Sequence, residues 1–207
     1  MYEIHINSSK IILIKTSFAE SVKKDETSIV ARYQGKRKTL LNYIDKAEKS
    51  NEGCTIIICS PYLHTLKTDF FSLYKIIKAA GGLVLNGKGE ALLIFRRGYW
   101  DLPKGKKEKK EKRKETAIRE IKEETGIENL HVLYPLPTTY HTYKIDKQRI
   151  LKQSYWYLME SDDENLVPQT DEDIDRVEWV SMERIRNGEM RPVFPSIERL
   201  LQHFIRE

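Results

Sequence analysis

The sequence predicts an α/β protein in which helices pack on mixed β-sheets, with a small α/β domain in residues 1–72 and a second domain in residues 73–207. Short alternating or β-branched apolar runs, which are typical of strands, are interspersed with segments whose apolar residues recur at helical spacing. The chain has 207 residues, of which 40% are hydrophobic and 32% charged. That length and composition are typical of a folded globular protein with a sizeable core.

In the first domain, apolar alternation or β-branched runs predict strands at 2–7, 10–15, 28–33 and 54–60. Apolar residues at helical spacing predict helices at 38–50 and 66–80. The second helix is expected to end at Gly81 and Gly82. A helix that leads directly into the next strand is a stiff joint, so we expect the two domains to pack in a fixed orientation. No catalytic arrangement is found in this half, and its role is left open.

The second domain is expected to begin with strands at 81–89, 91–98 and 99–105, followed by a helix from about 112 to 126. Ala117, Ile118, Ile121 and Thr125 form the inner face of this helix, and Gly126 is placed to cap its C-terminus. Further strands at 131–144, 150–161 and 175–181 and an amphipathic helix at 195–207 complete the domain.

Three sequence features bear on the cellular compartment: the apolar runs, the N-terminal residues and the cysteines. No apolar run approaches the ~18 residues of a membrane span, and the N-terminus lacks the basic and apolar regions of a signal peptide. Cys54 and Cys59 are an odd number of positions apart on one predicted strand, so they face opposite sides, and neither a disulfide nor a metal pair is expected. We therefore expect a reducing, cytoplasmic setting and no membrane partner.

The chain is basic, with a net charge of +5 and a pI of about 9.0, which suits an anionic partner. Much of the excess lies in residues 104–114, which hold eight basic residues and two glutamates. This run is either a solvated surface loop or an electropositive rim for phosphate-bearing substrates.

Three glutamates, Glu120, Glu123 and Glu124, lie close together on the predicted helix 112–126. Residues three and four apart are neighbours on a helix, and each like-charged pair costs about 0.2–0.5 kcal/mol when nothing neutralises it. Taken alone, the cluster is most simply a solvated acidic face. At the border of an apolar stripe, however, carboxylates can face a cleft and form an oxygen-ligand site for Mg²⁺.

The residues around these glutamates favour the metal site. Gly105 is followed after five residues by Glu111, and after seven more by "REIKEETGI", residues 119–127. This spacing resembles the Nudix box, the loop–helix–loop signature of hydrolases acting on nucleoside diphosphates linked to another group. The resemblance covers roughly residues 79–207. It implies a Nudix α/β/α sandwich with a mixed sheet, and Mg²⁺-dependent hydrolysis (with Mn²⁺ as an alternative) of a pyrophosphate linkage.

The resemblance also implies roles for individual residues. Glu120 and Glu124 match the family's metal ligands, with Glu123 helping directly or through water, and the carbonyl of Lys104 is a further candidate ligand. Glu111 and Arg119 match a pair that orients these ligands, because an arginine fork can lock a carboxylate rotamer; the alternative is an ordinary surface ion pair. For the general base that activates water, Glu123 is the first choice and Glu172, in an acidic loop, the second.

The substrate is less well defined. The flank "GYWDLPKGK" is similar to that of Nudix enzymes for dinucleoside polyphosphates and diphosphoinositol polyphosphates. Phosphate contacts are then expected from Arg96, Arg97, Lys104 and Lys106, each of which is otherwise a surface cation. Tyr143, with Tyr140 as the near alternative, lies where dinucleoside polyphosphate members carry a base-stacking aromatic residue, although strand tyrosines more often pack.

We therefore expect a Nudix-type pyrophosphohydrolase with a small-molecule nucleotide or polyphosphate substrate. The main alternative is a Nudix-fold module that senses a ligand without cleaving it. A nucleic-acid partner is disfavoured, because no basic strand is interleaved with aromatic residues. The sequence leaves a homo-oligomer open.

Overall fold

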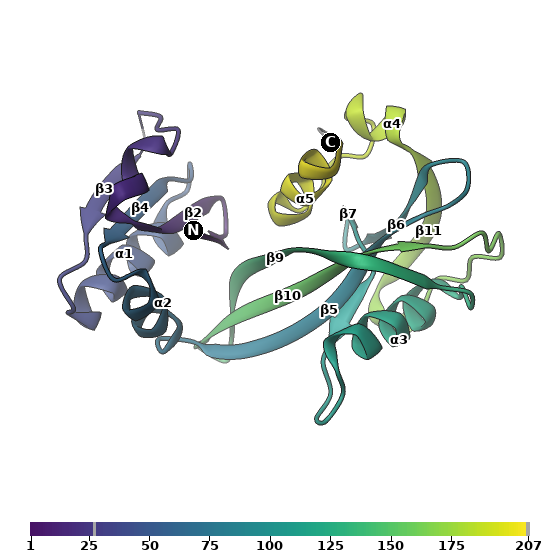
Figure 1. The fold of residues 1–207 in the computed structure, drawn as a ribbon, viewed down its shortest axis with the longest axis horizontal. Coiled ribbons are helices and arrows are strands. Elements are labelled where there is room, and N and C mark those ends of the chain that lie inside the picture. The colour runs from purple at the N-terminus through teal and green to yellow at the C-terminus, as the bar shows by residue number, and fades with distance from the viewer. Residues whose placement is uncertain (27, 206–207) are drawn as a thin grey trace. The chain divides into compact units, whose positions relative to one another are not determined.

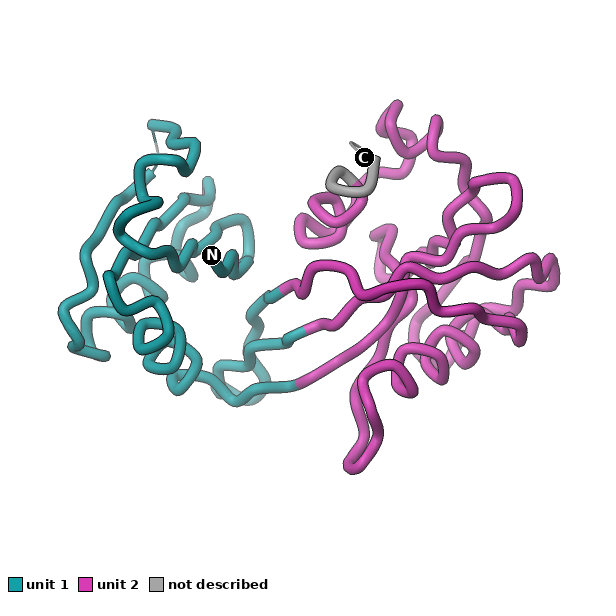
Figure 2. The backbone as a smooth tube through the Cα atoms, in the orientation of Figure 1, with its two compact units in different colours: residues 1–77, 140–153 teal, residues 78–139, 154–207 magenta. Residues whose placement is uncertain are grey.

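The computed structural model describes residues 1–26 and 28–205, with the backbone alone described for 202–205. The chain divides into two compact units (Figure 2). Unit 1 comprises Met1–Ile77 and Tyr140–Gln153, and unit 2 comprises Lys78–Thr139 and Ser154–Glu207. Residues 140–153, which the sequence pattern assigned to the second domain, thus group with the first unit. None of the described helices is long and apolar enough to cross a membrane.

Unit 1 is built on a sheet of order β3–β4–β2–β1 (Figure 1). Its strands are β1 (Tyr2–Ile6), β2 (Ser9–Lys15), β3 (Ile29–Arg32) and β4 (Thr55–Ser60), each at a predicted position. β1 and β2 form an antiparallel hairpin, whereas β2, β4 and β3 are parallel. The helices are α1 (Arg37–Lys49) and α2 (Leu63–Phe71), and the 3₁₀ turn η1 (Thr16–Ser21) follows β2.

The alternation of strand side chains gives this sheet two apolar faces. One face packs against α1 and α2, where Leu40, Ile44 and Leu66 are fully buried. The other face carries a smaller cluster that includes Cys59 and is covered by residues from η1 and the segment after it. Cys54 packs on the first face, and both cysteines are free thiols. The prediction that they face opposite sides is confirmed.

Residues 140–153, the turn end of strands β9 and β10, are bound to unit 1. Residues 140–142 pair in parallel with β1, and Leu151 is fully buried in the same cluster as α1. The guanidinium of Arg149 donates to Glu48 at 2.8 and 3.0 Å and also binds Asp45. Lys144 lies 2.7 Å from Glu48. Both apolar contacts and ion pairs therefore hold this segment on the first unit.

The prediction of a helix over 66–80 is wrong in its second half. α2 ends at Phe71, and β5 (Lys75–Leu85) begins soon after it. The apolar spacing continued past the true helix end, but pairing with neighbouring strands takes over from local propensity. Gly81 and Gly82 do not stop a helix. They allow close packing inside β5, because an added Cβ would lie 2.1 Å from the Pro103 carbonyl oxygen at Gly81 and 2.9 Å from Ile121 Cδ1 at Gly82.

Unit 2 contains a sheet in which β11, β6, β5, β10 and β9 are neighbours, with β7 paired to β6 and β8 to β5. The strand bounds are β6 Glu90–Arg96, β7 Tyr99–Asp101, β8 Lys104–Lys106, β9 His131–Ile145, β10 Gln148–Glu160 and β11 Ile174–Ser181. The helices are α3 Arg113–Thr125, α4 Met182–Arg186 and α5 Pro195–Ile205, and η2 is Thr170–Glu172. The last two residues of the helix predicted at 195–207 lie outside the described residues.

The two faces of this sheet are covered by different helices. Val84 and Leu92 belong to the core under α3, whereas Leu83 and Leu93 belong to the core that includes α5. Figure 1 shows α3 and α5 on opposite sides of the strands. The result is the predicted α/β/α sandwich, with α3 held against the sheet by Ala117.

Candidate active site

The predicted helix 112–126 is confirmed as α3 (Arg113–Thr125) with defined caps at both ends. At the N-terminus the Lys112 N–H donates to the Glu115 carboxylate at 2.9 Å. At the C-terminus Gly126 adopts φ 78°, a left-handed conformation that glycine enters without strain, and its N–H bonds to the Lys122 carbonyl. Side chains on such a helix are held more firmly than loop side chains.

Glu111 and Arg119 form the paired fork that the resemblance predicted. Arg119 Nε lies 2.9 Å from Glu111 Oε1, and Arg119 Nη2 lies 3.1 Å from Glu111 Oε2. Thr116 and the Glu108 N–H also donate to Glu111. The hydrogen bond from Arg119, helped by these donors, lowers the pKa of Glu111 to about 2. Glu111 is therefore ionised throughout the neutral range and fixes the arginine.

The same arginine reaches two glutamates of the cluster. Arg119 Nη1 lies 2.8 Å from Glu120 Oε1 and 2.8 Å from Glu123 Oε2. Glu120 is buried, whereas about half of the Glu123 side chain is exposed. Burial, opposed by Arg119, raises the pKa of Glu120 above its ordinary value. The fork from Glu111 thus ends on the carboxylates that the sequence proposed as ligands.

The Glu120 carboxylate occupies the space where a side chain at position 105 would lie. β8 pairs with β5 so that Gly105 lies opposite Ala80. A Cβ at Gly105 would be 1.6 Å from Glu120 Oε2. The glycine therefore provides a cradle for this carboxylate against the backbone of β8.

Glu124 is the most buried carboxylate of the cluster, with no exposed surface. Its Oε2 accepts the Lys104 N–H at 2.7 Å. Its Oε1 has no hydrogen-bond partner, and the nearest cation that pairs with it, Arg96 Nη1, is 3.8 Å away. Burial raises the pKa of Glu124 to about 7, although Lys104 and Arg96 oppose the rise.

A buried acid that the sequence analysis did not single out, Asp101, completes the surroundings of Glu124. Asp101 Oδ2 lies 2.6 Å from Lys104 Nζ and 3.2 Å from Arg96 Nε. Burial opposes its ionisation, but Lys104 and Arg96 outweigh burial and lower the pKa of Asp101. The sequence did offer one sign of this buried acid: Asp101 lies between two apolar residues and three positions before Lys104. That signal is weak, because the sheet pairing brings in the arginine.

The donor chemistry fits the predicted Mg²⁺ site. Glu120 and Glu124 are one helical turn apart, both supply hard oxygen ligands, and Glu124 Oε1 is a buried oxygen that lacks a hydrogen bond. Among the side chains that the structure describes, those of residues 1–26 and 28–201, no three from His, Cys, Asp or Glu are already gathered as a metal-binding group. In this structure the Glu120 and Glu123 carboxylates form ion pairs with Arg119.

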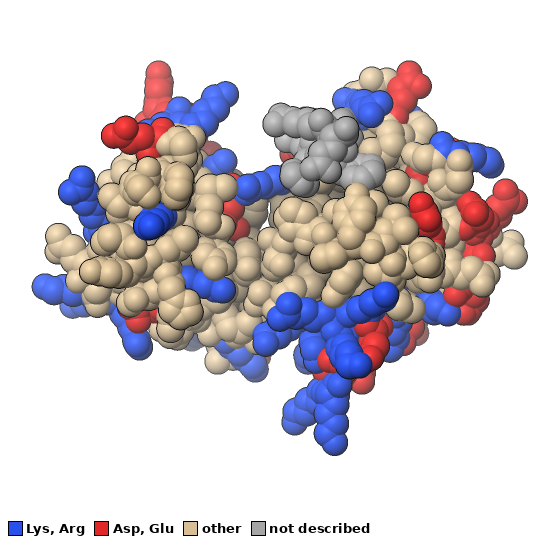
Figure 3. Space-filling model, in the orientation of Figure 1, with Lys and Arg blue, Asp and Glu red and all other residues tan. Residues whose placement is uncertain are grey.

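The four cations predicted to bind phosphate differ in exposure: two lie in the buried cluster around Asp101 and two are exposed. Lys104 is 5% exposed and its ammonium binds Asp101, while Arg96 lies in the same cluster. Arg97 is exposed and pairs with Asp173 at 2.9 Å. Lys106 is exposed at the end of β8, where the loop to α3 begins. Figure 3 shows that basic side chains gather on this projecting loop, whose exposed lysines are Lys109, Lys110 and Lys112.

Tyr143 and Tyr140 belong to unit 1, whereas the box residues belong to unit 2. Tyr143 stacks on His141, with ring centroids 5.7 Å apart, and Tyr140 is buried against Tyr2 and Phe71. Base stacking by Tyr143 stays a prediction. Glu172, the second candidate for the general base, is exposed in η2, and its charge contributes to the raised pKa of Glu120.

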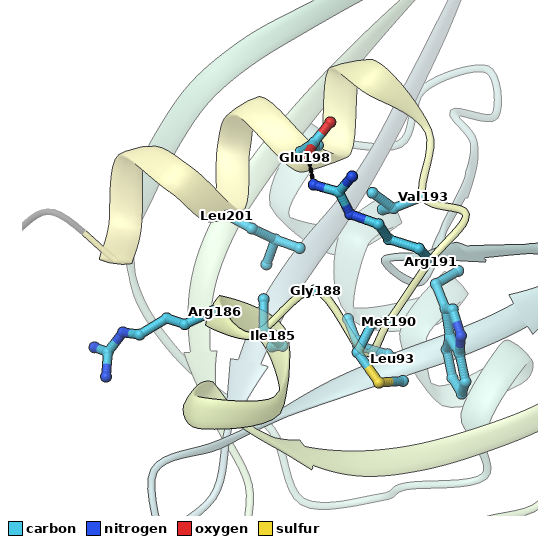
Figure 4. A pocket seen from close by; sticks show the side chains of 10 residues that line it. Leu93, Ile185, Arg186, Gly188, Met190, Arg191, Val193, Glu198 and Leu201 are labelled. Atoms are coloured by element: carbon cyan, nitrogen blue, oxygen red, sulfur yellow. Dashed lines mark hydrogen bonds and ion pairs between the residues drawn. The ribbon is translucent and has the colours of Figure 1, made fainter.

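A separate cavity of about 200 Å³ lies in unit 2 beside α4 and α5 (Figure 4). Its wall includes Leu93 and Trp100 from the α5 side of the sheet, and Arg191 pairs with Glu198 at 3.1 Å within it. Trp100 and Asp101 are consecutive strand residues and point to opposite faces. The cavity is therefore on the other face from the carboxylates of α3, and we assign it no part in the reaction.

Comparison with known proteins agrees with this geometry. The family model for the NUDIX domain matches residues 75–204. The chain is 37% identical over 123 residues to a mutator-type protein, MutT4, from Mycobacterium tuberculosis (strain CDC 1551 / Oshkosh). That match covers 52% of this chain and 47% of the relative, so the chain aligns with about half of that protein's length.

Two solved structures share the fold. A MutT protein from Methanosarcina mazei Go1 has a TM-score of 0.51 and 24% identity, covering 64% of this chain and 95% of that one. A MutT NUDIX hydrolase from Burkholderia pseudomallei has a TM-score of 0.50 and 19% identity, covering 63% and 97%. The match of the NUDIX model over residues 75–204 includes the whole box, and the chain belongs to the NUDIX domain family.

Proposed function

We propose that the protein is a Mg²⁺-dependent hydrolase that cleaves a pyrophosphate linkage in a nucleotide-type substrate, with dinucleoside polyphosphates as the first class to test. The observation that carries the proposal is the pair of buried carboxylates, Glu120 and Glu124, held one turn apart on α3. Gly105 makes room for the first, and the Lys104 N–H orients the second. Members of the Nudix family typically use a divalent metal.

In this proposal Glu120 and Glu124 hold the metal, with the carbonyl of Lys104 as a further ligand. Mg²⁺, when bound, neutralises phosphate charge and lowers the pKa of water. Glu111 holds Arg119 through two hydrogen bonds. Arg119 in turn places Glu120 and Glu123, so the Glu111–Arg119 fork orients one metal ligand and the proposed base without touching the substrate.

The general base is proposed to be Glu123, which is half exposed and can reach a water beside the metal ligands. Glu172 is the competing candidate because its charge acts on Glu120. Glu123→Gln and Glu172→Gln separate them. Loss of the base should lower kcat and remove its ionisation from the kcat–pH profile, whereas the other variant should keep the profile.

The lysine-rich loop between β8 and α3 supports a substrate with several phosphates. Its exposed cations are attached to the strand that carries Gly105 and to the helix that carries the glutamates. Attraction by exposed cations extends over a Debye length of ~8 Å at physiological salt. We propose that this loop raises the local concentration of polyanionic substrates and takes no part in the chemical step.

The proposal is tested by incubating the 207-residue protein with Mg²⁺ and a panel of dinucleoside polyphosphates, nucleoside triphosphates and diphosphoinositol polyphosphates. The products and their phosphate counts are then identified. Turnover that disappears in Glu124→Gln supports the proposal. Binding of one panel member in calorimetry without cleavage would favour the ligand-sensing alternative and contradict the enzyme proposal.

A further inference from the structure

We propose that Asp101 is a positioning residue for Glu124. It holds two neighbouring cations, Arg96 and Lys104, away from the one Glu124 oxygen that is free to bind a metal. The inference rests on the proposed function, because it takes Glu124 to be a metal ligand.

Asp101 is 1% exposed and both of its oxygens are engaged. Oδ1 accepts the Leu102 N–H at 2.8 Å, which fixes the carboxylate to the backbone. Oδ2 binds the Lys104 ammonium at 2.6 Å and the Arg96 guanidinium at 3.2 Å. One oxygen of a rigid carboxylate therefore holds both cations.

The two oxygens of Glu124 are not equivalent. Oε2 is occupied by the Lys104 N–H, whereas Oε1 is buried without a hydrogen bond. Arg96 Nη1 lies 3.8 Å from Oε1, about 1 Å beyond an ordinary hydrogen bond. The guanidinium is thus near the proposed ligand atom but is bound to a different acid.

The charge of Asp101 decides which acid Arg96 binds. In a buried site the attraction between opposite charges is stronger than in water. If Asp101 were neutral, Arg96 would move onto Glu124 Oε1 and compete with the metal for it. Asp101→Asn keeps the size of the side chain and one acceptor oxygen but removes this charge. Loss of such an outer partner typically weakens metal binding by about 10–100-fold.

The test is a calorimetric titration of the 207-residue protein with Mn²⁺ in the absence of substrate. We expect Asp101→Asn to bind Mn²⁺ about 10–100-fold more weakly than the wild type. The double variant Asp101→Asn/Arg96→Met should regain most of the affinity, because the competing cation is gone. A merely structural Asp101 predicts the opposite, since a second change in the same cluster would not restore binding.

Asp69→Asn is the matched control. Asp69 is also a clamped carboxylate, bound by Arg37 at 2.9 Å and Tyr33 at 2.7 Å, but it lies in unit 1. Its replacement should lower the unfolding temperature and leave Mn²⁺ affinity unchanged.

Unchanged Mn²⁺ affinity in Asp101→Asn, or a double variant no tighter than the single one, overturns the inference while the proposed function stands. A wild type that binds no Mn²⁺ overturns both. If Asp101→Asn does not fold, Arg96→Met alone decides: binding as tight as or tighter than the wild type supports the inference, and weaker binding overturns it.

Discussion

Replacing Gly105 by alanine tests whether the reaction depends on the place of the Glu120 carboxylate. Gly105 lies in β8 with a backbone conformation that alanine can adopt, so the change acts through the added methyl group alone. The Cβ would lie 1.6 Å from Glu120 Oε2 and 2.1 Å from its Cδ. Since real Cβ contacts are essentially never below 3.0 Å, the carboxylate must retreat by at least about 1.4 Å.

A misplacement of about 1 Å in a catalytic site can cost a factor of about 100 in rate. We therefore expect kcat to fall at least about 100-fold and the Mg²⁺ concentration for half-maximal activity to rise. The free energy of unfolding without metal should change by no more than about 1–2 kcal/mol. Burial raises the pKa of Glu120, so moving its carboxylate out of this place should cost the fold little.

Steady-state kinetics at several Mg²⁺ concentrations and urea unfolding of the same preparations provide the measurement. Gly87→Ala is the control, because its Cβ would meet only the side chain of Asp162, at 3.1 Å, in an exposed turn. A Gly105→Ala protein with wild-type kcat and Mg²⁺ dependence would refute the argument that β8 positions Glu120.

Three further predictions concern the surroundings of the site. Changing Lys106, Lys107, Lys109 and Lys110 to glutamine should raise KM and flatten its dependence on NaCl, while kcat stays within about twofold of the wild type. A wild-type KM that does not depend on salt, together with variants whose KM is unchanged, would show that these lysines are only solvated. Burial raises the pKa of Glu48, but hydrogen bonds from Arg149 and Lys144 outweigh it and hold the pKa below its ordinary 4.5. The stabilisation from these pairs is present above pH 4.5 and is lost as the pH falls through the lowered pKa of Glu48. Urea unfolding below pH 4.5 should therefore show a smaller loss of stability with falling pH in Glu48→Gln than in the wild type. Equal losses in the two proteins would contradict the pairing. A protein truncated to residues 72–207 should keep turnover but unfold at a lower temperature, because Leu151 loses its partners in unit 1; a folded truncated protein without turnover would show that residues 1–71 contribute to catalysis.

The box could be predicted from sequence because its geometry is local. Residues four apart on a helix share a face whatever the rest of the fold does, so Glu120 and Glu124 had to be neighbours. The Glu111–Arg119 pair was predicted through the family resemblance. Its bidentate geometry and the lowered pKa of Glu111 needed the structure.

Features that depend on pairing between strands could not be predicted. Asp101 meets Arg96 because β7 folds back on β6, and it meets Lys104 because the chain turns between β7 and β8. No regular spacing of residues in the sequence predicts either contact. The helix expected over 66–80 failed for the same reason, since residues 75–80 satisfy a helical pattern but pair as a strand. The grouping of residues 140–153 with unit 1 likewise rests on contacts with β1 and α1.

The metal-binding role of the α3 carboxylates is tested most directly by Glu120→Gln and Glu124→Gln, with thermal unfolding measured with and without Mg²⁺ and turnover measured on the preferred substrate. Each variant should nearly lose turnover and, without metal, be no less stable than the wild type, because burial raises the pKa of both carboxyl groups and so disfavours their charged forms in the fold. Mg²⁺ should raise the unfolding temperature of the wild type by ligand linkage and that of the variants less. Lys122→Gln, which removes a pair with the exposed Glu128 and leaves the glutamate cluster intact, should behave as the wild type. Full activity in both glutamate variants, or equal stabilisation of variants and wild type by Mg²⁺, would contradict the account.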